Sequence, residues 1–118
     1  MATFTVAAAT DWISVLALGS VGDRWRLDDY DIFAEVKAPG DDEVLIDMSL
    51  ANGRLIISDP VSRRLEINVG WALIEPLASV FPASFEFDFM FVNRTTEVRW
   101  RGETHTLLIT RGITFPEA

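Results

Sequence analysis

The sequence predicts an all-β domain, folded either as an antiparallel sandwich or as a small barrel. Three observations indicate this: about seven or eight short segments have a strand-like pattern, turn-forming residues separate them at close spacing, and only one stretch has a helical pattern. No internal repeat, linker or low-complexity segment divides the 118 residues. We therefore expect residues 1–118 to form a single domain with one core.

The strongest pattern lies at residues 84–92, where phenylalanine occupies every second position. Successive side chains of a strand point to opposite faces, so the rings should share one face while Glu86, Asp88 and Met90 share the other. Such a strand is half-buried and needs a second layer to cover it. The predicted inner face consists of Phe85, Phe87, Phe89 and Phe91.

The N-terminal part supplies four further predicted strands, at residues 3–8, 11–18, 30–38 and 44–49. The second has two fairly apolar faces, which favours an inner strand. The third alternates clearly. Its predicted core face is Tyr30, Ile32, Ala34 and Val36, and its outer face is Asp31, Phe33, Glu35 and Lys37. Loops or turns are expected at residues 19–23 and 39–42.

The middle of the chain predicts a hairpin and then one short helical stretch. Residues 54–58 and 63–69 follow an Asn-Gly pair and are separated by an Asp-Pro turn, which is typical of two paired strands. Leu65, Ile67 and Val69 should point inward. One short helical turn is expected near residues 75–81, because Pro76 suits a first helical turn and Pro82 would close it.

The C-terminal part predicts a hairpin connection at residues 93–96 and a long last strand at residues 97–110. Val98 and Trp100 share one parity, whereas Leu107 and Ile109 share the other. This slip in phase indicates a bulge or bend, for which Gly102 is the natural position. Residues 113–118 are expected to form a tail.

The composition narrows the classes of function. The formal net charge is −8, and an acidic chain is repelled by phosphate, which argues against nucleic acid and anionic membranes as partners. The absence of cysteine removes disulfides, thiolate metal sites and cysteine nucleophiles. No basic segment precedes the apolar N-terminal residues, and no apolar run approaches the roughly 18–20 residues of a membrane span. We expect neither a secretory signal nor membrane insertion.

No catalytic or cofactor motif is found, so we expect a protein that is not an enzyme and that binds no cofactor. His105 is the only histidine. Without a cysteine or a second histidine beside it, an exposed strand position near the bend is favoured over a zinc or acid–base role. Glu86 and Asp88 lie on one strand face about 7 Å apart, and paired carboxylates can hydrolyse glycosides. The phenylalanines point to the other face, which argues against that reading.

A calcium site is the alternative to solvated carboxylates in the acidic segments, because hard cations bind several oxygens. The ordered spacing of a calcium-binding loop is missing, so we expect no metal site. Solvated carboxylates that keep strand edges apart are the favoured interpretation. The acidic positions are Asp28, Asp29, Asp31, Asp41, Asp42, Glu43 and Asp47.

Four tryptophans leave a carbohydrate-binding sandwich open as an alternative, because indole rings can stack on sugars. By parity, Trp12 and Trp100 should belong to the core. Trp25 and Trp71 lie in connections, where partial exposure is expected. Packing in the core or at a protein interface is the competing interpretation.

Three segments, in this order, resemble small phage and prophage β-sandwich proteins. Residues 26–37 resemble their early turn and alternating strand, and residues 52–67 resemble their glycine-containing hairpin. Residues 80–89 resemble the proline-containing entry to their penultimate strand. The resemblance spans about residues 10–116. The sequence departs from the family at Asp29 and Ser84, where glycine is usual, which affects the turn types more than the strand order.

The resemblance implies an Ig-like or baseplate-type β-sandwich and a structural role in the virion, in the tail or the baseplate. Some relatives resemble the N-terminal domain of baseplate proteins that carry receptor-binding modules. The expected partners are other virion proteins or further copies of the chain, and the expected location is the virion. Phe33 is a candidate contact residue because it interrupts a polar outer face, and Trp25 and Trp71 are the others.

Overall fold

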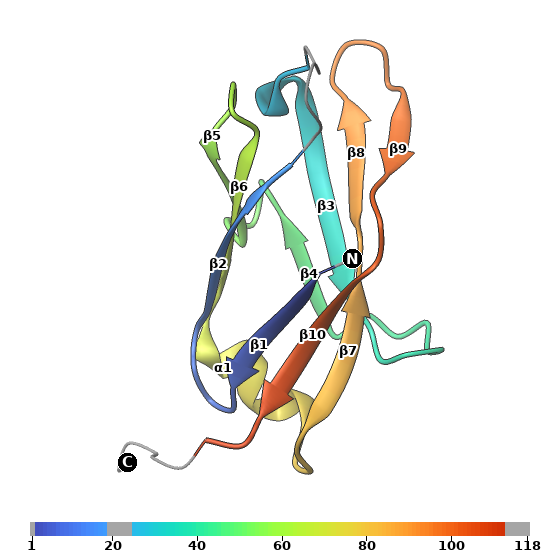
Figure 1. Cartoon of the computed structure of the whole chain (residues 1–118). Helices are drawn as coiled ribbons and strands as arrows, with labels where there is room; N and C mark the ends of the chain where they lie inside the picture. Colours follow the sequence, from blue (N-terminus) through green and yellow to red (C-terminus); the bar gives the residue numbers. More distant parts are fainter. Residues whose placement is uncertain (1, 19–24, 113–118) are drawn as a thin grey trace.

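The computed structural model describes residues 2–18 and 25–112, which form ten strands and three short helical turns (Figure 1). The strands are β1 (Thr3–Ala7), β2 (Trp12–Ala17), β3 (Tyr30–Val36), β4 (Ile46–Ser49), β5 (Leu55–Asp59), β6 (Arg64–Val69), β7 (Ala83–Phe87), β8 (Phe89–Asn93), β9 (Arg99–Arg101) and β10 (His105–Thr110). The helical turns are η1 (Leu27–Asp29), α1 (Trp71–Ile74) and η2 (Glu75–Leu77). The loop predicted at residues 19–23 and the tail predicted at 113–118 both lie outside the described residues.

The strands form two layers. One layer is the sheet β2-β6-β5. The sheets β4-β3-β8-β9 and β1-β10-β7 make up the other, because β7 runs into β8 and Lys37, just after β3, exchanges two backbone hydrogen bonds with Glu86 of β7 at 2.9 and 2.8 Å. Figure 1 shows β2, β5 and β6 on one side of the molecule and β3, β8 and β9 on the other. The predicted all-β, sandwich-like fold is confirmed.

The alternating phenylalanines share one buried face, as predicted. All four rings of residues 85–91 are buried between the layers, and the side chain of Glu86 is exposed. Phe87 also contacts Trp12 from the opposite layer, with ring centroids 5.3 Å apart. The strand pattern is interrupted only at Asp88, between β7 and β8. This alternating segment therefore supplies much of the contact between the layers.

The predicted purely antiparallel arrangement is wrong for one pair. β1 runs parallel to β10, with Thr3 opposite Thr106 and Ala7 opposite Thr110. The chain crosses to the other layer between β1 and β2, so these consecutive strands do not form a hairpin. Alternation along a strand does not encode the direction of its neighbour, which is why this pairing was not predicted. The predicted break in the last strand is confirmed as the gap between β9 and β10.

β2 was predicted to be an inner strand, and this is wrong. Within the described part of the chain it pairs only with β6 and therefore lies at a sheet edge. Its inward face carries the buried Trp12, but Ile13 and Val15 on the outward face are 60% and 56% exposed. The second apolar face of β2 is therefore part of the exposed outer surface of its layer, and the strand is not buried on both sides.

The helical stretch begins earlier than predicted, at Trp71, and ends at Leu77. Val80, inside the range predicted to be helical, lies beyond the helical turns and is 78% exposed. The first turn is held by a distant residue, because the Oδ1 atom of Asp11 accepts a hydrogen bond of 2.8 Å from the backbone N–H of Trp71. A helix start that depends on a side chain 60 residues away leaves no local signal.

The substitution Asp11→Ala is expected to lower the free energy of unfolding by about 0.5–2 kcal/mol, because it leaves the N–H of Trp71 without its charged acceptor. Asp42→Ala removes the same charge from an exposed loop and is expected to change stability by less than about 0.5 kcal/mol. Urea unfolding of the two variants measures the difference. Equal losses in both variants would contradict a capping role for Asp11.

Candidate functional site

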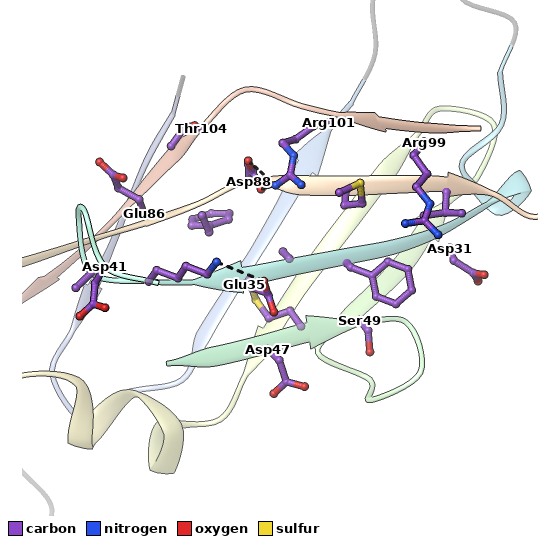
Figure 2. Close-up of a pocket in the computed structure, with 18 of the residues that line it drawn as sticks. Asp31, Glu35, Asp41, Asp47, Ser49, Glu86, Asp88, Arg99, Arg101 and Thr104 are labelled. Atoms are coloured by element: carbon purple, nitrogen blue, oxygen red, sulfur yellow. Dashed lines mark hydrogen bonds and ion pairs between the residues drawn. The ribbon is translucent and has the colours of Figure 1, made fainter. Parts of the chain in front are cut away.

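The outer face of the sheet β4-β3-β8-β9 is hollowed into a groove of about 810 Å³ (Figure 2). Along β3 and β8 the outward-facing side chains that line it alternate with buried ones, so the same pattern that fills the core also builds the groove. β3 and β8 form its floor, while β4 and β9 form its two edges. This surface is the candidate functional site.

The register places three apolar side chains next to one another on the floor of the groove. Phe33 of β3 lies opposite Met90 of β8, and Val92 follows Met90 two residues later on the same face. Phe33 is 45% exposed, and the other two are half-buried. We call Phe33, Met90 and Val92 the central apolar strip. Covering this strip with another molecule would remove exposed apolar surface from water, which is the most favourable contact that the groove can offer.

Charged side chains surround the central apolar strip. Arg101 on β9 lies opposite Met90, and Arg99 lies opposite Val92. On the other side, Glu35 of β3 lies opposite Asp47 of β4. Figure 2 shows the two arginines on one side of the groove and Asp47 on the other. The groove therefore has an apolar floor, two arginines along its β9 edge and a carboxylate, paired with Arg54, at its β4 edge.

Most of these charges are paired within the molecule. The ion pairs are Arg101–Asp88 at 3.1 Å, Arg94–Asp31 at 3.1 Å, Arg54–Asp47 at 2.9 Å and Lys37–Glu35 at 3.6 Å. All four are substantially exposed, and such pairs contribute only about 0–1 kcal/mol each to stability. Their main effect here is to orient the side chains around the groove rather than to hold the fold together.

Arg99 differs from the other cations of the groove, Lys37 and Arg101, which are both paired. It is exposed, and within the described residues its guanidinium group makes no hydrogen bond or ion pair. A guanidinium beside an apolar strip can bind a carboxylate through two parallel hydrogen bonds or lie flat on an aromatic ring. Arg99 is thus the cation of this surface that is best placed to contact another molecule.

The three residues predicted to form an interaction surface do not lie together. Phe33 lies at the centre of the groove. Trp25 is half-buried and does not line the groove. Its ring lies edge-on against Tyr30 and Trp100, at centroid distances of 5.7 and 5.5 Å. Trp71, 52% exposed, lies on α1, which Figure 1 shows at the opposite end of the sandwich from β9. Only Phe33 belongs to the groove.

Several carboxylates of the groove were considered from the sequence as metal or catalytic candidates, but Met90, Arg99 and Arg101 were not singled out. Met90 was placed on the correct face of its strand, but its position beside Phe33 depends on the register between β3 and β8. Arg99 and Arg101 join them through the pairing of β9 with β8. The parity of each strand was readable, whereas the neighbours across strands required the structure.

Only two of the four tryptophans contact each other, Trp25 and Trp100, while Trp71 lies apart on α1. Trp12 is buried as predicted, but Trp100, predicted to be core, is 38% exposed because β9 is a three-residue strand at the sheet edge. One face of Trp100 stacks on Phe91 with centroids 4.1 Å apart, and the Arg63 guanidinium lies 5.3 Å from the ring centre of Trp25. The Trp25 and Trp100 rings meet at 86° rather than side by side, so they form no flat platform for a sugar, and the arrangement does not favour the carbohydrate-binding alternative.

His105 was predicted to be exposed, and this is wrong, because only 7% of it is accessible. Its Nδ1 atom accepts a hydrogen bond of 3.2 Å from the backbone N–H of Ala2, and its ring packs against Phe4, Phe87 and Phe89. Burial lowers the pKa of His105, while the carboxylate of Glu103 opposes this shift. His105 does not line the groove that contains Asp31 and Glu35.

The carboxylates of the groove are the remaining candidates for metal or acid–base chemistry. Within residues 2–18 and 25–112, no group of three or more His, Asp or Glu side chains is arranged to hold a metal ion. Glu86 and Asp88 both line the groove, as their shared parity predicted, and Asp88 is engaged by Arg101. The arrangement favours recognition by contact and charge over coordination.

Comparison with known proteins does not assign a function to this chain. No protein-family model matches this chain, and no curated protein is significantly similar to it in sequence. Among the described residues, no helix has both the length and the apolar character needed to cross a membrane. The sandwich-like fold and its outer groove are therefore the features from which function is inferred.

Proposed function

We propose that this protein is a non-enzymatic assembly component of a phage or prophage particle, in its tail or baseplate, and that it acts through protein–protein contacts made by the groove. One observation carries the assembly role: the central apolar strip is exposed in the middle of a sheet face and is surrounded by charges. An apolar centre with a polar rim is the usual anatomy of a protein interface.

The phage or prophage setting is supported by the resemblance of residues 26–37, 52–67 and 80–89 to small β-sandwich proteins of phages and prophages. The sandwich-like fold agrees with what that resemblance implies. The net charge of −8 favours a protein partner over nucleic acid, because both DNA and RNA carry a dense negative charge.

The proposal is tested by the composition of assembled particles. Particles are induced from a strain that encodes the protein, purified on a density gradient and analysed by mass spectrometry and by immunogold electron microscopy. We expect the protein in tailed particles at a fixed copy number, with gold label on the tail or baseplate. Intact tailed particles that lack the protein, while it accumulates free in the lysate, would overturn the proposal.

The role of the groove is tested in the same particles with two matched variants. Phe33→Asp places a charge in the central apolar strip, and we expect it to reduce incorporation at least tenfold. Val15→Asp introduces the same charge at a 56% exposed position on the outer face of the other layer and should incorporate normally. Normal incorporation of Phe33→Asp would exclude the groove as the assembly surface.

A further inference from the structure

The N-terminal arm, which we define as residues 2–8, is held in place by the opposite end of the chain. Its strand β1 runs parallel to β10, and within the described residues β10 is its only strand partner. The backbone N–H of Thr106 donates to the carbonyl of Ala2 at 3.0 Å, and that of Ala8 donates to the carbonyl of Thr110 at 2.8 Å. Figure 1 shows β1 along β10, with the turn after it leading to β2 in the other layer.

The side chains of the arm fill a socket formed by the rest of the molecule. Val6 and Ala8 are buried. The ring of Phe4 lies 5.7 Å from that of Phe87 and 6.0 Å from that of Trp12, measured between centroids, so the arm contacts both layers. Removing the arm would expose this apolar surface and leave the edge of β10 unpaired. A segment that replaces it must therefore carry the same side chains at the same spacing.

The turn between the arm and β2 holds one residue in an unfavourable backbone conformation. Ala9 has a φ of 57°, in the left-handed region, where the Cβ atom of any residue but glycine crowds the following carbonyl oxygen. The hydroxyl of Thr10 donates to the carbonyl of Ala7 at 2.6 Å and closes the turn. Asp11, the next residue, is fixed by its hydrogen bond to α1. An extended Ala9 would relieve the strain and let the arm swing out while β2 stays in place.

We infer that the arm is exchangeable, and that in a dimer the arm of each copy takes the place beside β10 of the other copy. The inference goes beyond the proposed assembly role and does not use the groove. A second copy is the partner because its arm carries the side chains that fit the socket and remakes the same hydrogen bonds to β10. Exchange therefore keeps the packing of the arm and relieves the strain at Ala9 in both copies. Short connecting loops under strain favour such exchange.

The exchanged dimer should form only at high protein concentration, and slowly. Opening the turn loses the hydrogen bond between Thr10 and Ala7, and joining two copies costs translational and rotational freedom. The arm must also leave its own socket before it enters another, so buried surface is exposed on the way. We therefore expect single-copy and two-copy species that separate by size-exclusion chromatography.

The first test compares the natural protein with Ala9→Gly. Each full chain is incubated at roughly 10 µM to 1 mM, and the mass of each species is measured by light scattering after chromatography. We expect the natural protein to form a two-copy species at the upper end of this range. Glycine adopts a positive φ readily, so Ala9→Gly should stabilise the closed turn and raise the concentration needed for dimerisation roughly tenfold or more.

Ala9→Pro should have the opposite effect. The proline ring fixes φ near −65°, which the closed turn excludes, so we expect dimerisation at a roughly tenfold lower concentration or less. Glu97→Gly is the matched control, because Glu97 has a φ of 59° in the turn between β8 and β9, which carries no arm. It gains the same relief of strain and should dimerise as the natural protein does. Circular dichroism establishes that the variants are folded.

A disulfide identifies the exchanged strand directly. Thr5 lies opposite Leu108 in the pairing of β1 with β10, neither side chain is buried, and the natural chain has no cysteine. Neighbouring strands lie about 4.8 Å apart, which suits a disulfide. In the double variant Thr5→Cys, Leu108→Cys, oxidation of the isolated two-copy species should link two chains on a denaturing gel without reductant. Oxidation of the single-copy species should close the bond within one chain.

Three results would overturn the inference. They are a natural protein that stays a single copy up to roughly 1 mM, dimerisation that is equally strong in the natural protein and in Ala9→Gly, and a two-copy species whose disulfides close within single chains. The last two would mean that the copies associate through another surface. None of these results bears on whether the protein is present in tailed particles, so failure of arm exchange and failure of the proposed function are distinguishable.

Discussion

Replacing Phe87 with alanine is expected to lower the free energy of unfolding by about 3–5 kcal/mol, the usual cost of removing a buried aromatic ring. Phe87 is 3% exposed and contacts Phe4, Trp12, Phe89 and His105, so its ring joins both layers of the sandwich. A small domain has a total stability of about 5–15 kcal/mol, so this loss is a large share of it. Urea unfolding followed by circular dichroism measures the change.

Two controls separate the lost packing from a general sensitivity of this strand. Phe87→Leu retains most of the apolar volume and should lose clearly less stability than Phe87→Ala. Glu86→Ala changes the neighbouring residue, whose side chain is exposed, and should alter stability by less than about 0.5 kcal/mol. A large loss in Glu86→Ala, or a small one in Phe87→Ala, would contradict the assignment of the phenylalanine face as the core.

Acidification is expected to destabilise the protein through His105. Burial lowers the folded-state pKa of His105 below its ordinary value of 6.5, so the unfolded chain binds a proton that the folded protein resists. The stability that His105 contributes is therefore fully present above about pH 6.5 and is lost as the pH falls from there toward the folded-state pKa. The slope should not exceed about 1.4 kcal/mol per pH unit, the limit for one proton.

The hydrogen bond to Ala2 gives this effect a structural consequence. Nδ1 can accept from the N–H of Ala2 only while it carries no proton, so protonation of this nitrogen removes a contact of the segment that leads into β1. We expect the amides of β1 to exchange faster at pH 5.5 than at pH 7.5, after correction for the intrinsic exchange rates.

His105→Asn is the matched control, because the Asn Oδ1 atom can accept the same hydrogen bond but does not titrate. Its unfolding free energy should be nearly constant from pH 8 to pH 5, whatever its absolute value. Hydrogen bonds lower the pKa values of Asp28 and Asp59, so these carboxylates make the unfolding free energy depend on pH only in more acidic solution. Equal slopes for the natural protein and His105→Asn between pH 7 and pH 5 would contradict the role of His105.

The strand faces were predictable because each depends on residues only two positions apart. The rings of Phe85 and Phe87, the core and outer faces of β3, and the inward side of β6 all follow from the twofold repeat of an extended chain. The break near Gly102 was equally visible, because the parity of the apolar residues changes across it. None of these inferences needed to know which strands are neighbours.

The predictions that failed depended on distant residues. The start of α1 is held by Asp11, and the burial of His105 depends on rings from β1, β7 and β8. Trp100 is exposed because its strand is short and lies at an edge, and β2 lies at an edge because the chain changes layers before it. In each case, a local pattern allowed two outcomes, and tertiary contacts selected one.

The candidate site divides in the same way. The sequence by itself determined that Phe33 would be exposed among polar side chains, and that Glu86, Asp88 and Met90 would share the outer face of their strand. Only the tertiary structure decided that Phe33 lies beside Met90, that Arg99 flanks Val92, and that β4 and β9 form opposite edges of one groove. The physical reason is that side-chain direction follows from backbone geometry within a strand, whereas register and strand order follow from contacts between segments far apart in the chain.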